Sequence, residues 1–250
     1  MRDMKIKTYV INLKRSADRR EYILKETARY ACMDVELVEA VDGYRLLPEE
    51  TERRFDVKRF TYRYKRYPFP GEVGCTLSHQ ECYRRLLNSD EEVALILEDD
   101  VVFLQPELVD AVMAECCELL KKKKGGVFIY SLLPVSSTRG RDMGNGYSIY
   151  RAWFGLGAYA YLIHRNVANK LLTDIPSVLV DDYQYMNLKG IKVYGLFPLF
   201  STGDSMGTNI QQGKQDIEYV TNIPVRYRLQ NLFRGGCRKL LLLLHILSVR

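Results

Sequence analysis

Residues 93–100 have the sequence VALILEDD, in which an apolar run is followed directly by Glu98, Asp99 and Asp100. An aliphatic run bounded in this way is typical of a buried strand of an α/β sheet. Acids at the carboxyl end of such a strand lie in the crevice where these sheets bind ligands. Adjacent carboxylates repel one another unless a cation or hydrogen-bond donors hold them, and all-oxygen ligands suit Mn²⁺ or Mg²⁺. A solvated acidic turn is the alternative at this point.

Strand-like and helix-like segments alternate along most of the chain. We expect strands at 8–13, 35–40, 93–97, 127–132, 159–163 and 193–200. We expect helices at 16–30, 75–87, 106–124 and 166–172, and a short one opened by Asp181. Residues 48–70 lack clean periodicity and predict an irregular or lid-like insertion, and residues 136–146 predict a polar loop. The alternation predicts an α/β fold with a mixed or parallel sheet covered on both faces.

The charge is concentrated at the carboxyl end of the chain. The 250 residues, enough for one large or two small domains, carry a formal net charge of +6. No acidic residue follows Glu218, whereas Arg226, Arg228, Arg234, Arg238, Lys239 and Arg250 do. The rest of the chain is therefore near neutral, which argues against a uniformly basic nucleic-acid-binding protein.

The tail combines a basic segment, residues 226–239, with a nearly all-apolar one, residues 240–249. Such a short apolar segment cannot span a bilayer, which needs about 20 residues. The combination suits an interfacial helix on an anionic membrane, although packing on the core or a dimer contact would also explain it. We see no export signal, so we expect a cytoplasmic protein with reduced thiols.

Two further motifs favour structural interpretations. Cys75, His79 and Cys82 share one helix face, but structural zinc needs four ligands, so buried cysteines and a hydrogen-bonded histidine are expected. Residues 203–207 match the G-x-S-x-G nucleophile elbow. The polar stretch after it is a poor helix, so a serine hydrolase using Ser205 is only a minor alternative. No phosphate-binding P-loop or Rossmann fingerprint is present in the sequence.

Several segments in this order resemble glycosyltransferase family 25, the lipooligosaccharide-biosynthesis glycosyltransferases related to the collagen galactosyltransferases. They are YVINL at 9–13 with Arg15, Arg19 and Arg20, AVDG at 40–43, GEVGCTLSH at 71–79, LEDDV at 97–101, GAYAYLI at 157–163 and VDD at 180–182. The resemblance implies a GT-A-like fold at 1–222, followed by the membrane-associating tail at 223–250. Within that fold it implies a Rossmann-like donor-nucleotide half at about 1–105 and an acceptor half at 106–222.

The resemblance also implies roles for the acidic residues. Glu98-Asp99-Asp100 would correspond to the family's D-x-D-type motif. Asp100 would ligate Mn²⁺ or Mg²⁺ at the donor diphosphate, and Glu98 would contact the ribose or, through water, the ion. Asp99 would lie near the nucleotide in a mainly structural role. The other residues expected near the nucleotide are Asn12, Leu13, Arg15, Arg19 and Asp42.

Inversion at the anomeric carbon needs one base to take the proton from the acceptor hydroxyl. Asp181 and Asp182 are our catalytic candidates, with simple helix capping as the alternative. We therefore expect an inverting hexosyltransferase that moves galactose from UDP-galactose to a lipooligosaccharide or other lipid-linked glycan. We expect it at the inner face of a bacterial cytoplasmic membrane, with no nucleic-acid partner. A catalytically silent nucleotide-sugar-binding or membrane scaffolding domain is the main alternative.

Overall fold

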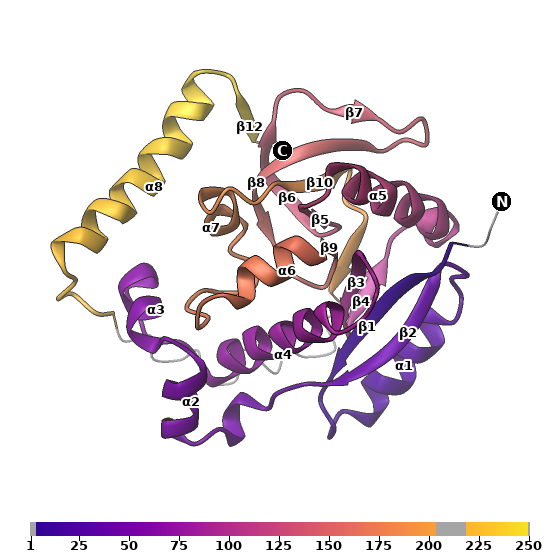
Figure 1. The fold of residues 1–250 in the computed structure, drawn as a ribbon. Coiled ribbons are helices and arrows are strands. Elements are labelled where there is room, and N and C mark those ends of the chain that lie inside the picture. The colour runs from indigo at the N-terminus through magenta and orange to yellow at the C-terminus, as the bar shows by residue number, and fades with distance from the viewer. Residues whose placement is uncertain (1–3, 204–218, 250) are drawn as a thin grey trace.

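The computed structural model describes residues 4–203 and 219–249, which form a central sheet flanked by helices (Figure 1). The strands are β1 (Ile6–Asn12), β2 (Met33–Glu39), β3 (Val93–Glu98), β4 (Val101–Phe103), β5 (Val127–Ile129), β6 (Leu132–Ser137), β7 (Arg141–Asp142), β8 (Ser148–Leu156), β9 (Ala160–His164), β10 (Val193–Phe197), β11 (Ser201–Gly203) and β12 (Leu247–Val249). The helices are α1 (Ala17–Thr27), α2 (Pro48–Arg54), α3 (Val57–Tyr64), α4 (Pro70–Leu87), α5 (Val109–Lys123), α6 (Arg165–Leu172), α7 (Tyr183–Leu188) and α8 (Val225–Leu243). Two 3-10 turns, η1 (Gly43–Arg45) and η2 (Pro106–Leu108), lie between them.

The main sheet has ten strands among the described residues, in the order β12-β6-β8-β10-β5-β9-β3-β1-β2, with β7 paired to β8. β1 runs parallel to β2 and β3, and β10 runs parallel to β5. β9 lies between β3 and β5 and is antiparallel to both, and β8 and β12 also run against their neighbours. The prediction of an α/β fold with a mixed sheet flanked by helices is confirmed.

The carboxyl ends of β1, β2 and β3 meet at one edge of this sheet. Near the end of β1, Ile11 lies opposite Val38 of β2 and Glu98 of β3. Because the three strands run in the same direction, the segments that follow them leave the sheet side by side. An edge of this kind is where open α/β sheets bind ligands.

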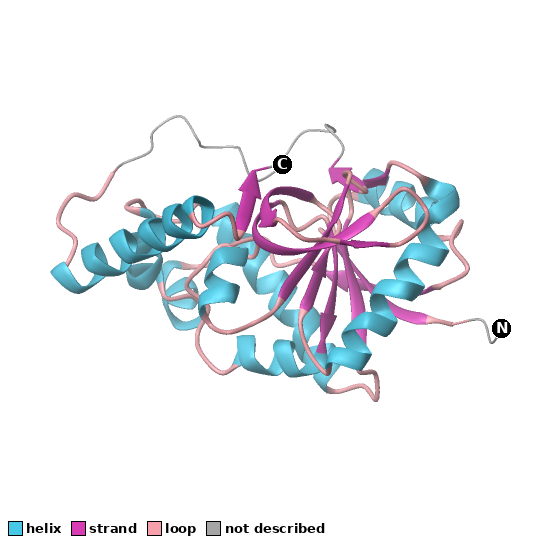
Figure 2. Cartoon of the chain, turned by 90° about the horizontal axis from the view of Figure 1, so that it is seen from above, coloured by secondary structure: helices cyan, strands magenta, loops and turns pink. Residues whose placement is uncertain are grey.

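Helices cover both faces of the sheet (Figure 2). Alternate residues of a strand point to opposite faces, so β3 contributes to two cores. Leu95 belongs to the core that includes Ile23 of α1, and Ile96 belongs to the core that includes Tyr83 of α4. All five residues of the apolar run 93–97 are at most 2% exposed, which explains why the run is continuous rather than alternating.

Residues 48–70 are not irregular, so that prediction is wrong. They form α2 and α3 and the start of α4. Pro48 occupies the first turn of α2, and the Asp56 side chain caps α3 by accepting a hydrogen bond from the Arg59 amide (2.8 Å). Phe60 of α3 is fully buried in a small apolar cluster with residues of α4. These short-range capping and packing signals outweigh the polar composition of the segment.

The second half of the sheet differs from expectation in three respects. Residues 136–146, expected to form a loop, include the end of β6 and all of β7. The neighbouring strand β8 was not expected, because its polar and aromatic residues lack a clean alternation. The strand at 160–164 was expected, but an apolar run carries no information on strand direction, so its antiparallel pairing could not be foreseen.

The predicted tail consists of α8 and β12. Helix α8 runs along the side of the molecule beyond α3 and α7, and none of its residues is buried (Figure 1). β12 pairs with β6, which ties the end of the described chain back to the sheet. Within the described ranges, none of the helices combines the length and the apolar character that crossing a membrane would require.

Candidate functional site

A cleft opens where β1, β2 and β3 end. It has an empty volume of about 690 Å³ and lies between the segments that follow these strands and the start of α4. Its lining residues are Ile11, Leu13, Arg15, Arg19, Ala40, Val41, Asp42, Gly43, Tyr44, Gly71, Cys75, Ser78, His79, Glu98, Asp99 and Asp100. The fold therefore brings together every residue predicted to lie near the donor or the metal except Asn12.

The three acids follow one another around a sharp turn. β3 ends at Glu98, Asp99 and Asp100 form the turn, and β4 begins at Val101. β4 leaves the main sheet and pairs instead with β11 in a separate two-stranded sheet. Since the chain changes direction at the turn, the three carboxylates can reach the same cleft from adjacent positions.

Asp99 is held by two donors from the segment around the end of β1. Asn12 Nδ2 donates to Asp99 Oδ2 (2.7 Å), and Arg19 Nη1 donates to Asp99 Oδ1 (2.8 Å). Asn12 is 5% exposed and also donates to the Ser16 carbonyl (3.1 Å). Burial raises the pKa of Asp99, although both donors favour its ionised form. Asn12 therefore supports the acidic turn from behind the cleft rather than facing it.

Only one of the two carboxylate oxygens of Asp100 has a hydrogen-bond donor among the described residues. Arg19 Nη2 donates to its Oδ2 (3.0 Å), but Oδ1 is buried without a hydrogen-bond partner among the described residues. Burial, followed by the neighbouring charge of Glu98, raises the pKa of Asp100 to about 7. A buried carboxylate oxygen without a donor is costly unless a cation or a proton satisfies it. The donor set around Asp100 therefore fits a divalent cation with oxygen ligands.

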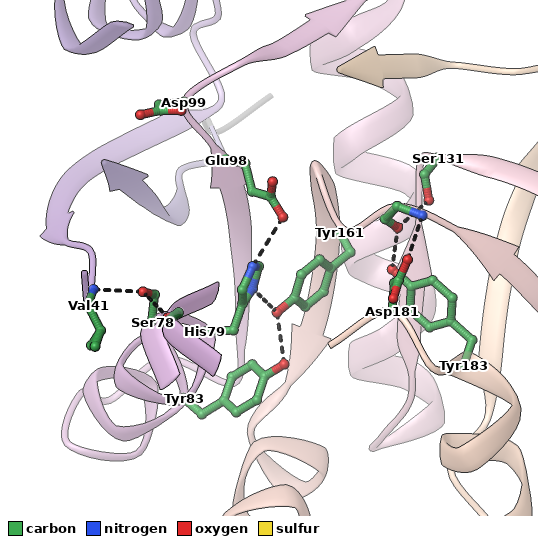
Figure 3. Close-up of polar contacts among 12 residues, drawn as sticks. Val41, Ser78, His79, Tyr83, Glu98, Asp99, Ser131, Tyr161, Asp181 and Tyr183 are labelled. Atoms are coloured by element: carbon green, nitrogen blue, oxygen red, sulfur yellow. Dashed lines mark hydrogen bonds and ion pairs between the residues drawn. The ribbon is translucent and has the colours of Figure 1, made fainter. Parts of the chain in front are cut away.

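Glu98 is linked to a buried chain of side chains on α4 and β9 (Figure 3). His79 Nε2 lies 3.3 Å from Glu98 Oε1, and His79 Nδ1 lies 2.8 Å from the Tyr161 hydroxyl. The Tyr161 and Tyr83 hydroxyls are 2.9 Å apart. His79 is 1% exposed, so its ring is fixed by these contacts. The histidine is hydrogen-bonded, as expected, and it also lines the cleft beside Glu98.

Cys75 completes a group of possible metal ligands with His79 and Glu98. Their ligand atoms all lie within 4.8 Å of one another. Burial raises the pKa of the Cys75 thiol, and the nearby charge of Glu98 raises it further. Cys82, which the sequence places on the same helix face as Cys75 and His79, is fully buried and is not part of this group.

Two glycines let the loop after β2 approach the start of α4. A Cβ atom on Gly43 would lie 1.7 Å from the Pro70 carbonyl oxygen, and one on Gly74 would lie 2.5 Å from the Val41 carbonyl oxygen. Ser78 Oγ accepts a hydrogen bond from the Val41 amide (2.8 Å) and fixes the same contact (Figure 3). This close packing forms one wall of the cleft.

Asp42 stands on that wall and pairs with Arg15. The Arg15 guanidinium donates to the Asp42 carboxylate, which also accepts a hydrogen bond from the Tyr44 amide (3.2 Å). The Arg15 side chain is 46% exposed, so this ion pair can open at little cost when a ligand enters the cleft.

Asp181 lies outside the cleft lining but close enough to interact with Glu98. The Gly157 amide donates to its carboxylate (3.1 Å), and the Ser131 and Tyr183 hydroxyls both donate to the Gly157 carbonyl at 2.9 Å. Figure 3 shows Glu98 at the end of β3 and Asp181 in the segment before α7. Burial raises the pKa of Asp181, and the charge of Glu98 adds to this effect.

Asp182 occupies a different environment. Its carboxylate caps α7 by accepting a hydrogen bond from the Tyr185 amide (2.9 Å). It also forms an ion pair with Arg63 (2.6 Å) and accepts a hydrogen bond from the Tyr64 hydroxyl. Burial alone would raise the pKa of Asp182, but Arg63 outweighs it and holds the pKa below its ordinary value. Asp182 is thus fully engaged in joining α7 to α3.

Tyr159 is a site residue that the sequence did not single out. A Cβ atom on Gly157 would lie 2.3 Å from its ring, so the glycine makes room for the tyrosine. Burial raises the pKa of Tyr159, and the charges of Glu98, Asp100 and Asp181 raise it further. The tyrosine therefore lies among the acids of the site. Tyr159 lies in GAYAYLI, one of the segments that resemble the family, so the sequence could have indicated it as a site residue. In the same way, the segment GEVGCTLSH could have indicated Ser78 and His79.

Ser205, the nucleophile of the minor hydrolase alternative, lies outside the described residues.

One family model and several curated relatives match this chain. Residues 5–133 match the family described as glycosyltransferase family 25 (LPS biosynthesis protein). The procollagen lysyl hydroxylase and glycosyltransferase of Acanthamoeba polyphaga mimivirus is 30% identical over 215 residues, which is 78% of this chain and 23% of that protein. Procollagen galactosyltransferase 2 of Homo sapiens is 37% identical over 98 residues, which is 38% of this chain and 16% of that protein.

A solved structure of UDP-glucose pyrophosphorylase with UDP-glucose superposes with a TM-score of 0.41 at 9% identity, over 80% of this chain and 92% of that one. The chain spans less than a quarter of the length of the two curated relatives named above. The family match covers half of the chain and includes β1, β2, the start of α4 and the acidic turn. The chain therefore belongs to glycosyltransferase family 25.

Proposed function

We propose that this chain is an inverting, metal-dependent hexosyltransferase that moves galactose from UDP-galactose to a lipooligosaccharide or other lipid-linked glycan. One observation carries the proposal: Asp100 Oδ1 is buried without a hydrogen-bond partner among the described residues, in a cleft that also contains Arg15, Arg19 and Asp42 at the strand ends. Such a cleft matches a ligand that combines a divalent cation, a diphosphate and a nucleoside.

The donor half of the reaction depends on neutralising the departing diphosphate. Asp100 and Glu98 are the residues that would hold Mn²⁺ or Mg²⁺, which when bound acts as a Lewis acid on the diphosphate oxygens. Arg15 lines the cleft with its guanidinium partly exposed, so it can leave Asp42 and donate charge-assisted hydrogen bonds to phosphate. Asp42 is then free to accept a hydrogen bond from the ribose or the base.

The acceptor half requires a base, and Asp181 is our choice. Its burial gives it a raised pKa, so the carboxylate is a stronger proton acceptor than an ordinary aspartate. It takes the proton from the acceptor hydroxyl as that oxygen bonds to the anomeric carbon and the bond to the diphosphate breaks. Asp182 is committed to Arg63 and to the cap of α7, so we assign it a structural role.

Galactose and the acceptor are supported by the relatives and the family rather than by the cleft itself. A human relative is a procollagen galactosyltransferase, and the family description refers to LPS biosynthesis. The exposed basic and apolar residues of α8 support attachment to an anionic membrane surface, where a lipid-linked acceptor would be encountered. We accordingly propose a peripheral location at the inner face of a bacterial cytoplasmic membrane.

Hydrolysis of UDP-galactose in the presence of Mn²⁺ tests the activity without knowledge of the acceptor. Asp100→Asn removes the charge at the proposed ion site, whereas Asp34→Asn removes an exposed charge outside the cleft and serves as the control. We expect hydrolysis by the wild type and the control, and none above background in Asp100→Asn. Binding of UDP-galactose without turnover in the wild type would favour the catalytically silent alternative.

A further inference from the structure

A second groove, lined by a different set of residues from the cleft, lies between α3, α7 and α8. Its empty volume is about 1130 Å³, open to solvent. Its lining residues are Arg59, Arg63, Ser177, Val178, Tyr185, Leu188, Lys189, Tyr227, Gln230, Asn231, Phe233 and Arg234. Four of these residues are cationic and none is acidic, so the groove favours an anion.

Two of the cations have guanidinium groups that are not fully satisfied. Arg63 uses Nε to bind Asp182, but its Nη2 is buried without a partner among the described residues. Arg234 is half-buried, and within the described ranges its guanidinium makes no ion pair. Burial, followed by the charge of Arg63, lowers the pKa of Arg234, and the charge of Asp182 opposes this effect.

The other two cations are only weakly engaged. Arg59 Nε lies 3.6 Å from Asp56 Oδ2, and Lys189 Nζ lies 3.7 Å from Asp174 Oδ2. Pairs that are this long and this exposed contribute little, so both side chains can turn toward a ligand.

The backbone of α8 holds Arg234 at the groove. Gln184 Nε2 of α7 donates to the Arg234 carbonyl (3.1 Å), and Asn231 Nδ2 of α8 donates to the Tyr62 carbonyl of α3 (3.1 Å). The rings of Tyr62 and Tyr227 also pack together, with centroids 4.8 Å apart. These contacts hold α8 against α3 and α7, and so hold Arg234 near Arg59 and Arg63 of α3 and near Lys189, which follows α7.

Large apolar side chains adjoin the cations on the outer face of α8. Leu232 is 71% exposed and Phe233, which lines the groove, is 66% exposed. A helix that displays both cations and large apolar residues suits the interface between lipid headgroups and acyl chains. A small soluble anion would contact only the cations, whereas a phospholipid would contact the cations with its phosphate and the apolar side chains with its acyl chains.

We propose that the groove between α3, α7 and α8 binds the phosphate of an anionic lipid headgroup, held mainly by Arg234 and Arg63. The proposal rests on the membrane association proposed above and assigns it to a defined site rather than to diffuse charge. The bound lipid would place α8 on the membrane surface and orient the cleft toward a lipid-linked acceptor.

Vesicle binding by two arginine variants of the same helix tests the site. Arg234→Gln removes a groove cation, and Arg238→Gln removes an exposed cation of α8 outside the groove lining. An arginine that acts only by general attraction to an anionic surface contributes about fivefold in binding. One that donates charge-assisted hydrogen bonds to phosphate contributes about 10- to 100-fold.

We expect Arg238→Gln to weaken cosedimentation with phosphatidylcholine vesicles containing phosphatidylglycerol about fivefold and Arg234→Gln about 10- to 100-fold. Arg59→Gln, a second groove variant at an exposed position, is expected to weaken vesicle binding about as much as Arg234→Gln does. If vesicle binding is weakened equally in the groove variants and in Arg238→Gln, the proposal of a lipid site in the groove is wrong. If the groove variants lose affinity for glycerol phosphate but keep wild-type binding to the vesicles, the ligand is a soluble phosphate and the headgroup assignment is wrong.

The same samples separate this proposal from the sugar-transfer proposal. UDP-galactose hydrolysis without vesicles is expected to be unchanged in both α8 variants, because neither residue lines the cleft. Absence of hydrolysis in the wild type with groove-dependent vesicle binding would refute only the enzymatic proposal. Absence of vesicle binding by the wild type would refute membrane association and the lipid site together.

Discussion

Replacing Gly43 with alanine perturbs the wall of the cleft at its tightest contact. The added Cβ would lie 1.7 Å from the Pro70 carbonyl oxygen, and the next atom it meets, the Pro70 carbonyl carbon, is at 2.6 Å. The obstacle is backbone, which cannot rotate away as the end of a side chain could. Gly43 does not have a left-handed backbone conformation, so the cost is steric.

The size of the effect follows from this overlap. Overpacking costs about 1–3 kcal/mol and sometimes more, and a displaced backbone places this substitution near or above the upper value, at ~3 kcal/mol. For a chain of this length each kcal/mol lowers Tm by about 2–4 °C, so we expect a loss of ~6–12 °C. Because Asp42 is the preceding residue, separating the loop from α4 should also move Asp42 and weaken the proposed UDP binding.

Thermal and urea unfolding of Gly43→Ala, each repeated with UDP and Mn²⁺, measure both effects. Gly235→Ala is the matched control, since no atom lies within 4 Å of its added Cβ and alanine favours a helix by about 0.5–1 kcal/mol. Gly74→Ala strains the same contact from the other side, so the double variant should lose less than the sum of the two. A free energy of unfolding for Gly43→Ala within about 0.5 kcal/mol of wild type would refute the reasoning.

Three further predictions concern acid–base and positioning residues. His79→Gln should lower kcat/KM for the donor about 10–100-fold at limiting Mn²⁺, because it loosens Glu98, one of the two residues proposed to hold the ion; an unchanged kcat/KM would contradict the link. Asp181→Asn should lower transfer to an acceptor by about 10²–10⁴-fold with donor binding intact, and activity near wild type would exclude Asp181 as the base. Asp182→Asn keeps a side chain that can cap α7 but leaves Arg63 unpaired, so it should cost about 3–5 kcal/mol in urea unfolding at neutral pH. The pKa of Asp182 is lower in the folded protein than in the unfolded chain, so the ionised carboxylate stabilises the fold above its ordinary pKa of about 4, and this stabilisation is lost as pH falls further. A difference in free energy of unfolding between the wild type and Asp182→Asn that stays constant down to pH ~2 would contradict this.

Much of the donor side could be predicted because it depends on local pattern. The continuous apolar run at 93–97 indicates a strand buried on both faces, and the acids that follow it must lie at the carboxyl end of that strand. The parallel order of β1, β2 and β3 then brings Arg15, Arg19 and Asp42 to the same edge. In the sequence these three residues were indicated only by the resemblance to glycosyltransferase family 25, because an apolar run carries no information on strand order or direction.

The remainder depends on contacts between distant segments. Asp181 and Asp182 are adjacent in the sequence, and only the packing of α3 against α7 shows that Asp182 is occupied by Arg63. His79 has the sequence signature of a core histidine, and its link to Glu98 exists because α4 crosses the sheet beside β3. The pairing of β12 with β6 could not be predicted either, since an apolar carboxyl end is equally compatible with a membrane.

Titration of UDP into the protein with and without Mn²⁺, for the wild type and Asp100→Asn, tests the central claim most directly. If Asp100 and Glu98 hold the ion at the donor diphosphate, Mn²⁺ should strengthen UDP binding to the wild type at least about tenfold, and Asp100→Asn should lose that gain. Asp34→Asn should behave as the wild type does. UDP affinity that is indifferent to Mn²⁺, or equal Mn²⁺ dependence in Asp100→Asn and the wild type, would contradict the account.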